Sequence, residues 1–178
     1  MNTFTQIPEW LLEIFKEIDY NFFLISDTHF YHTKIAEYCD RPDNWDDLII
    51  KNWNNTVNSN DVVLHLGDFA FGNFDMAQEK RKLLNGQIIL VKGNHDRHGV
   101  SWFNRVGIDV VKNPFILYNN GVRLLFSHVP QYPIDDDVIN IHGHVHNTRS
   151  LHWKCRDMIY KNCSVEAINY TPIKFKRS

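Results

Sequence analysis

The sequence has no long hydrophobic run, few cysteines and almost no net charge. No stretch reaches the roughly 18 consecutive apolar residues that a membrane-spanning helix requires. Residues 1–9 are polar and mixed, so they lack the basic region and apolar stretch of a secretory signal. The three cysteines, Cys39, Cys155 and Cys163, are too few and odd in number for a disulfide framework. We therefore expect a soluble cytoplasmic protein with no membrane partner.

The charge balance limits the classes of partner. The 19 basic and 21 acidic residues give a formal net charge of −2 at pH 7 and a pI near 6.5. This balance leaves no large basic surface for nonspecific nucleic-acid binding. Histidine, in contrast, is abundant: there are ten in 178 residues. Imidazole binds transition metals and titrates near neutral pH, so metal sites and proton transfer become candidate functions.

Length and hydrophobic pattern predict one mixed α/β domain. A chain of 178 residues with 43% hydrophobic residues suits a single domain with a sizeable core. Periodicity predicts helices at 8–19, 44–57 and 75–84, the first packed on the core. Short apolar runs typical of buried strands occupy 21–26, 61–66, 87–92 and 138–141. Two further strands, 115–118 and 122–127, flank the hairpin signal Asn119-Asn120-Gly121.

Five short polar motifs follow these apolar runs, and each contains metal-binding residue types. In chain order they are Asp27-Thr28-His29, Gly67-Asp68, Gly93-Asn94-His95-Asp96, Ser127-His128 and His142-Gly143-His144-Val145-His146. Each motif comes at the C-terminal end of a predicted strand, where ligands gather in α/β sheets. We therefore expect all five motifs to meet at one site.

The ligand types in these motifs indicate the metals and the chemistry. Carboxylate, carboxamide and imidazole groups without thiolates favour Mn²⁺, with Fe or Zn²⁺ possible, over Ca²⁺. Two such ions about 3.5–4 Å apart can clamp the attacking and leaving oxygens of a phosphate ester. A purely structural role is disfavoured, because buried unpaired charges are costly without a metal. The motifs therefore predict a two-metal hydrolase.

The ordered motifs resemble those of the calcineurin-like metallophosphoesterase superfamily, from about Phe22 to about Tyr170. The resemblance implies a four-layer α/β/β/α sandwich formed by a single domain over residues 1–178. The residues around Asp27 and Asp68 are similar to those of small, uncapped bacterial and phage phosphoesterases. Metal-dependent hydrolysis of a phosphoester is the activity that this resemblance implies.

The resemblance also implies a role for each motif residue. Asp68 would bridge two divalent ions, and a hydroxide between the ions would attack phosphorus in line. His95 would stabilise phosphoryl oxygens or protonate the leaving group, a role that suits an imidazole pKa of about 6.5. The remaining ligands form two sets: Asp27, His29 and His146 for the first ion, and Asn94, His128 and His144 for the second.

One departure from the family's protein phosphatases concerns His95. Those enzymes carry Asp and Arg shortly after the bridging Asp, and one of the two supports the catalytic histidine. Phe69, Ala70 and Phe71 stand at those places here. The partner that orients His95 therefore stays open, and a phosphoprotein substrate is disfavoured.

Several polar residues beside the motifs are open to two interpretations. The candidate substrate-binding residues are Asn94, His95, Arg97 and His32. For Arg97 and His32 the alternative is an ordinary loop position. His65 and His142 follow the strand pattern, and we expect them to pack in the core or to support the site.

The preferred function is hydrolysis of a phosphodiester in a nucleotide, a cyclic nucleotide or a nucleic-acid end. The core uses nearly the whole chain, so little remains for a cap, and an open cleft tolerates larger substrates. The near-neutral pI disfavours long DNA. The alternatives are a phosphomonoesterase and a metal-containing binding protein without turnover. His95 favours an enzyme, because a metal scaffold does not need the one motif residue assigned to no ion. The oligomeric state stays open.

Overall fold

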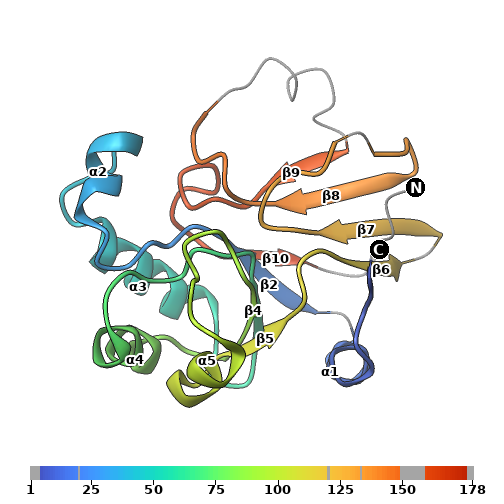
Figure 1. Cartoon of the computed structure of the whole chain (residues 1–178), viewed down its shortest axis with the longest axis horizontal. Helices are drawn as coiled ribbons and strands as arrows, with labels where there is room; N and C mark the ends of the chain where they lie inside the picture. The colour runs from blue at the N-terminus through green and yellow to red at the C-terminus, as the bar shows by residue number, and fades with distance from the viewer. Residues whose placement is uncertain (1–4, 20, 120, 133, 149–158, 176–178) are drawn as a thin grey trace.

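Two five-stranded sheets form the centre of the computed structural model, which describes residues 5–175 except 20, 120, 133 and 149–158. The first sheet contains, in spatial order, β10 (Ile173–Phe175), β2 (Phe22–Ile25), β3 (Val62–His65), β4 (Gln87–Val91) and β5 (Asp109–Val111). Strands β2 to β5 are parallel, and β10 is antiparallel to β2. Figure 1 shows this sheet between the second sheet and a group of helices.

The second sheet contains, in spatial order, β1 (Thr5–Gln6), β6 (Phe115–Asn119), β7 (Val122–Phe126), β8 (Val138–His142) and β9 (Tyr160–Asn162). Strands β6 and β7 form the predicted antiparallel hairpin, in which Asn119 pairs with Val122. Strands β7, β8 and β9 are parallel. Both sheets therefore contain a set of parallel strands, and these sets carry the polar motifs.

Alternating side chains of β2 divide between two hydrophobic cores. Phe22 and Leu24 pack in the core between the sheets, whereas Phe23 and Ile25 pack in the core under the helices. Every residue of β2 and of β3 is buried, because both faces of this sheet are covered. The interpretation of the short apolar runs as buried strands is confirmed.

Four helices cover the outer face of the first sheet. They are α2 (Thr33–Cys39), α3 (Trp45–Thr56), α4 (Phe74–Leu83) and α5 (Val100–Val106). The buried residues Trp45, Ile49 and Trp53 of α3 recur at helical spacing and face the sheet. Helix α1 (Glu9–Glu17) instead packs Leu11 and Phe15 into the core between the sheets.

The mixed α/β fold, with two sheets flanked by helices, is confirmed. In the described residues, Ile134 packs with Ile116 and Leu125 in a small cluster on the outer face of the second sheet, and no helix residue belongs to this cluster. No helix in the described part of the chain is both long and apolar enough to cross a membrane.

The predicted elements are present within a few residues of their predicted bounds, and six further elements were not predicted. These are β1, α2, α5, β5, β9 and β10, of which the helices have seven residues and the strands two or three. Segments of this length carry too little periodicity to be distinguished from loops. Helix α2 and the segment that follows β9 matter most for the site, because both contact the motifs.

Candidate metal centre

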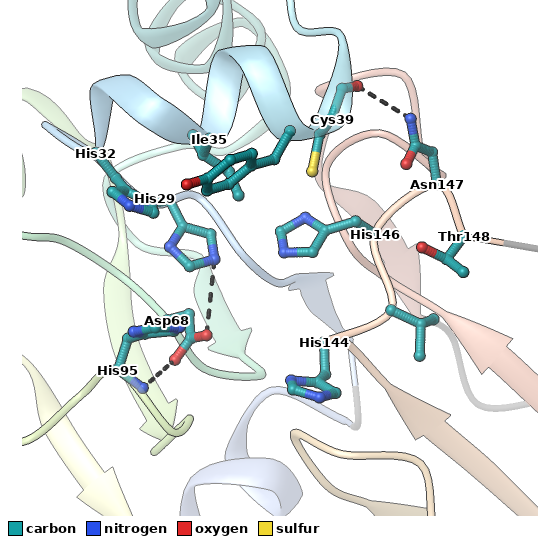
Figure 2. A pocket seen from close by; sticks show the side chains of 12 residues that line it. His29, His32, Ile35, Cys39, Asp68, His95, His144, His146, Asn147 and Thr148 are labelled. Carbon is teal, nitrogen blue, oxygen red and sulfur yellow. Dashed lines mark hydrogen bonds and ion pairs between the residues drawn. The ribbon is translucent and has the colours of Figure 1, made fainter.

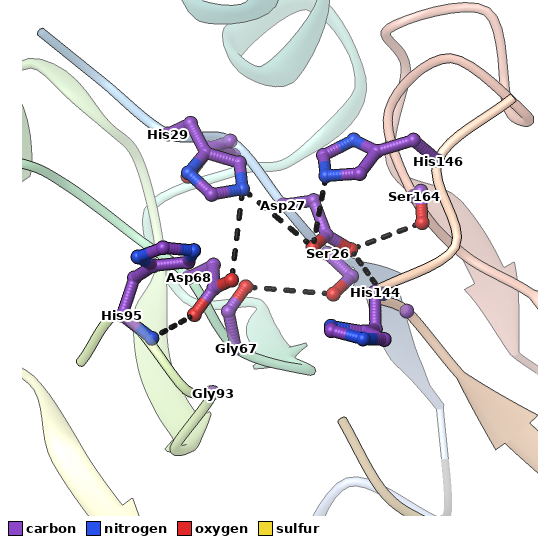
Figure 3. Close-up of polar contacts among 12 residues, drawn as sticks. Ser26, Asp27, His29, Gly67, Asp68, Gly93, His95, His144, His146 and Ser164 are labelled. Carbon is purple, nitrogen blue, oxygen red and sulfur yellow. Dashed lines mark hydrogen bonds and ion pairs between the residues drawn. The ribbon is translucent and has the colours of Figure 1, made fainter. Parts of the chain in front are cut away.

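The five motifs lie at the carboxyl ends of parallel strands. β2, β3 and β4 lead into the first three motifs, and β7 and β8 lead into the last two. Because strands run parallel within each set, their carboxyl ends share one edge of the sheet. Figure 3 shows side chains of both sheets pointing into one space there. The arrangement of the strands therefore brings the motifs together, as we expect from the sequence.

Five predicted ligands have left-handed backbone conformations. Their φ angles lie between 48° and 70°, at Asp27, His29, Asp68, His144 and His146. Residues with a Cβ atom adopt this region rarely, at a cost on the order of 1–3 kcal/mol each. Such strain persists only where the surroundings enforce it, and it is concentrated at functional sites.

Two motif glycines make room for the carboxylates. A Cβ atom at Gly93 would collide with the Asp68 carboxylate, and one at Gly143 would collide with Ser26 Oγ and the Asp27 carboxylate. Glycine therefore lets the neighbouring loops approach closely enough to bring the carboxylates together.

One group of ligand atoms surrounds Asp27 Oδ1, which lies 3.8 Å from both His29 Nε2 and His146 Nε2. The other oxygen, Oδ2, accepts hydrogen bonds from the His144 N–H at 2.8 Å and Ser164 Oγ at 3.0 Å. Among the described residues, Asp27 Oδ1 and both His29 ring nitrogens are buried without a hydrogen-bond partner. Unpaired buried polar atoms are costly, so this group fits a metal ion.

Asp68 lies between this group and a second one. Its Oδ2 is 3.6 Å from His29 Nε2 and 3.3 Å from His128 Nε2. Its Oδ1 accepts a hydrogen bond from the His95 N–H at 2.8 Å. One carboxylate oxygen therefore faces both groups, as a bridging ligand would.

The second group surrounds His128 Nε2. His128 Nδ1 lies 2.8 Å from the Leu66 carbonyl and donates to it, so the neutral ring has its lone pair on Nε2. That nitrogen is 2.9 Å from Asn94 Oδ1 and 3.2 Å from His144 Nδ1. Together with the Asp68 oxygen, atoms that can each bind a cation converge here. These residues also fit a metal ion.

Burial and neighbouring groups set the protonation of the ligands. Burial lowers the pKa of His29 to about 2, so its ring is neutral near pH 7. Burial opposes ionisation of Asp68, but hydrogen bonding and charge from neighbouring imidazoles lower its pKa to about 2. Burial also opposes the charged form of His146, but hydrogen bonds with Cys39 and Glu166 raise its pKa to about 10. A metal ion must therefore displace a proton from His146 but not from the other two.

A cavity of about 630 Å³ opens beside the ligands, a size typical of small-molecule sites (Figure 2). Its polar side contains His29, Asp68, His95, His144 and His146. One set of its other lining residues comes from α2 and the residue before it: His32, Ile35, Tyr38 and Cys39. The other set comes from the segment after β8: Val145, Asn147 and Thr148. Helix α2 therefore forms one wall of the site, which the sequence had suggested to be open.

Phe71 contacts two candidate substrate-binding histidines. The His32 ring stacks on Phe71 with a centroid distance of 3.9 Å and an interplanar angle of 6°. The His95 ring centroid lies 5.0 Å from that of Phe71. His32 and His95 also line the cavity. His95 therefore contacts the ring of Phe71, which occupies one of the positions after Asp68 where the superfamily's protein phosphatases carry Asp and Arg.

The remaining predicted residues lie farther from the cavity. Arg97 is exposed and is not among the residues that line it. Asn94 is also exposed, although its side chain contacts His128. His65 and His142 are buried, as expected. His65 accepts a hydrogen bond from the Gly67 N–H at 3.2 Å and lies 3.0 Å from Thr28 Oγ1, so it joins the first two motifs.

Several residues that contact the site were not assigned a role from the sequence, and the charged side chains among them include Asp96, Arg41 and Glu166. Asp96 accepts hydrogen bonds from the backbone of two motifs, including the Asp68 N–H at 2.7 Å and the Gly93 N–H at 2.8 Å. Arg41 and Glu166 form a buried ion pair at 2.6 Å, and Glu166 also contacts His146. Asp96 stands inside a recognised motif, but Arg41 and Glu166 belong to no local pattern that could have revealed them.

The sequence pattern of the calcineurin-like phosphoesterase superfamily domain matches residues 21–161. This chain belongs to that superfamily. Superfamily members are generally metal-dependent phosphoesterases, and the candidate ligand groups described above agree with that chemistry.

Two relatives share most of their length with this chain. An uncharacterized protein of Methanocaldococcus jannaschii is 35% identical over 161 residues, which cover 85% of each protein. The crystal structure of a protein of unknown function from Aquifex aeolicus matches with a TM-score of 0.70 and 30% identity, over 86% of this chain and 95% of that one. The structure of Pseudomonas putida nuclease MPE has a TM-score of 0.40 and 21% identity, over 69% of this chain and 60% of that one.

Proposed function

We propose that this protein hydrolyses phosphodiesters with the help of two divalent metal ions. The observation that carries the proposal is the position of Asp68 Oδ2, 3.6 Å from His29 Nε2 and 3.3 Å from His128 Nε2, between two groups of ligand atoms. When bound, two ions would activate a water molecule and stabilise negative charge on the phosphoryl oxygens. The ligand types favour Mn²⁺, with Fe or Zn²⁺ as alternatives.

The ligands divide between two ions, with Asp68 shared. Asp27, His29 and His146 would hold the first ion, and Asn94, His128 and His144 would hold the second. This division is supported by the two histidines around Asp27 Oδ1 and by the contacts of His128 Nε2 with Asn94 and His144. Asp68 remains ionised at neutral pH, because its pKa lies at about 2.

His95 is the candidate catalytic residue that binds no ion. The backbone N–H of His95 donates to Asp68 Oδ1, and the His95 side chain lines the cavity. The imidazole therefore lies beside the space for the phosphoryl group. From there it can hydrogen-bond a phosphoryl oxygen or donate a proton to the leaving group. His32, stacked on the same Phe71, is a second polar group that substrate can contact.

The cavity lining favours a diester over a monoester. Ile35, Tyr38 and Val145 give it an apolar wall, and the Tyr38 side chain is 69% exposed. Among the described residues, the lining includes no lysine or arginine. A diester carries one negative charge and an organic group on each side, whereas a monoester dianion benefits more from basic groups. A nucleotide or a nucleic-acid end, whose base can stack on Tyr38, is the proposed substrate class.

The test is turnover of bis(p-nitrophenyl) phosphate and of p-nitrophenyl phosphate by metal-stripped protein, with and without added Mn²⁺. We expect Mn²⁺ to restore turnover, with the diester cleaved faster than the monoester. Asp137→Asn, which alters an exposed carboxylate of the Arg123 ion pair, is a matched control, and we expect it to retain activity. Activity confined to the monoester would reverse the choice of substrate class. Bound metal without turnover of either compound would contradict an enzymatic function.

A further inference from the structure

Every second residue from 162 to 166, in the segment after the recognised motifs, contacts a ligand proposed for the first ion. Asn162, the last residue of β9, donates from Nδ2 to the His146 carbonyl at 2.8 Å. Ser164 Oγ lies 3.0 Å from Asp27 Oδ2, to which it can donate (Figure 3), and 2.8 Å from Asn162 Oδ1, a second acceptor for the same proton. Glu166 accepts from His146 Nδ1, with distances of 3.0 and 3.1 Å to its two oxygens. All three lie beyond residue 161, where the superfamily pattern ends.

Arg41 connects this segment to the first motif. Its Nε donates to Glu166 Oε1 at 2.7 Å. Its two terminal nitrogens donate to main-chain carbonyls, to Thr28 at 3.0 Å and to Asp27 at 2.8 Å. The Arg41 side chain is fully buried and its carbon Cζ lies 4.8 Å from the centre of the Trp45 ring. A buried charge pair of this kind, with all guanidinium nitrogens engaged, is geometrically specific.

The contact at His146 has a direct consequence for metal binding. A neutral histidine whose Nδ1–H is donated to a carboxylate presents the lone pair of Nε2 in a fixed direction, as His146 would after a metal ion has displaced its Nε2 proton. In His146 that direction leads to the first group, where Nε2 lies 3.8 Å from Asp27 Oδ1. Ser164 fixes the other oxygen of the same aspartate. The segment therefore restrains two of the three ligands of one ion.

We propose that Asn162, Ser164, Glu166 and Arg41 are positioning residues that set the affinity for the first of two ions. This inference rests on the proposed two-metal function. It assigns a role to a segment outside the recognised motifs, and it makes the two ion sites unequal, because these residues contact ligands of one site only.

Another use of Glu166 is disfavoured by charge. Cys39, His146 and Glu166 place potential ligand atoms within 4.8 Å of one another, and such a set could suit Zn²⁺. The Arg41 guanidinium, however, lies 2.6 Å from Glu166 Oε1 and would repel a cation bound there. Glu166 is therefore assigned to the orientation of His146.

The test is calorimetric titration of Mn²⁺ into metal-stripped Glu166→Gln and Ser164→Ala proteins beside wild type. We expect one of two ions to bind about 10- to 100-fold more weakly in Glu166→Gln, with the other unchanged. Saturating Mn²⁺ should restore kcat of the variant, and the KM for bis(p-nitrophenyl) phosphate should equal that of wild type. A variant that had lost its structure would recover neither value. Asp137→Asn is the matched control, because it alters an exposed arginine–carboxylate pair without touching the site.

The outcomes separate this inference from the proposed function. Unchanged affinity for both ions in the two variants would overturn the positioning role, even if the wild type is an active two-metal enzyme. A wild type that binds no Mn²⁺ would overturn the proposed function itself. If Glu166→Gln does not fold, Ser164→Ala decides, because it deletes a single oxygen that contacts Asp27.

Discussion

The two halves of the candidate metal centre are supported by different kinds of interaction. The first half consists of Asp27, His29 and His146, and the second half consists of Asn94, His128 and His144. Behind the first half lies the buried Arg41–Glu166 ion pair. Behind the second half, His128 is held by the uncharged Leu66 carbonyl, and Asn94 is exposed. Charged support is thus concentrated on one side of the shared Asp68, and the exposed ligand Asn94 lies on the other.

This difference indicates how affinity is divided between the two ions. Ligands whose rotamers are fixed by burial, packing and surrounding hydrogen bonds lose less entropy when an ion binds. Asp27 and His29 are almost completely buried, whereas Asn94 keeps contact with solvent. We therefore expect the first half to bind its ion tightly and the second half to exchange its ion more readily.

The largest effect is expected from a substitution of Asp68, because this ligand is shared by both halves and its loss removes the difference between them. Asp68→Asn keeps the size of the side chain but removes the charge that faces both halves. We expect phosphodiester turnover to fall by at least about 10³-fold, because stabilisation of several kcal/mol depends on the bound ions. Metal analysis after dialysis should give fewer than two ions per chain. Full activity with two bound ions would show that Asp68 is not a bridge.

His95→Asn should leave both halves intact and still impair catalysis. Removal of a general acid typically costs about 10²- to 10⁴-fold in rate, so we expect kcat to fall by at least about 10²-fold. Mn²⁺ titration should give wild-type stoichiometry and affinity. Loss of an ion in this variant would instead place His95 among the ligands.

A paired substitution tests the inequality of the halves directly. We expect His29→Ala to weaken its ion by about 100-fold or more and Asn94→Ala to weaken the other ion by about tenfold, on the scale of ligand-support effects. The reason is that His29→Ala leaves Asp27 Oδ1 buried beside an empty space, whereas solvent can replace the exposed Asn94. Isothermal titration with Mn²⁺ measures both. Equal losses would remove the distinction between the halves.

The smallest effect on the centre concerns His65, which contacts Thr28 and Gly67 in the first two motifs and is assigned to no ion. Burial lowers its pKa from 6.5 to about 3. Between these pH values the unfolded chain binds a proton that the native protein does not, so stability falls as pH decreases. The contribution is up to about 1.4 kcal/mol per pH unit. Urea unfolding of metal-free His65→Gln should therefore show a shallower pH dependence than wild type, and parallel curves would exclude this role.

Much of the fold could be predicted because its strands have simple environments. β2 and β3 are buried on both faces and therefore appear in the sequence as continuous apolar runs. Helix α3 shows its buried face through Trp45, Ile49 and Trp53. Helix α2 could not be found this way, because it has only seven residues and no side-chain cap at its start.

The candidate ligands could be proposed because each stands in a short motif, but their supports could not. Arg41 and Glu166 are 125 residues apart, and neither shows its partner through spacing or composition. The contact of His95 with Phe71 depends on ring positions that only the folded chain defines. The roles of the individual ligands and the single-domain extent over residues 1–178 stay predictions for the experiments above.

The distance in sequence between the partners of Asp27 has a consequence for how the protein is made. Asp27 is joined to His144 and Ser164, which follow it by 117 and 137 residues. A ribosome adds roughly 5–20 residues per second, so Asp27 exists for on the order of ten seconds before these partners do. A nascent chain therefore cannot complete this centre until residues 144–166 have been synthesised.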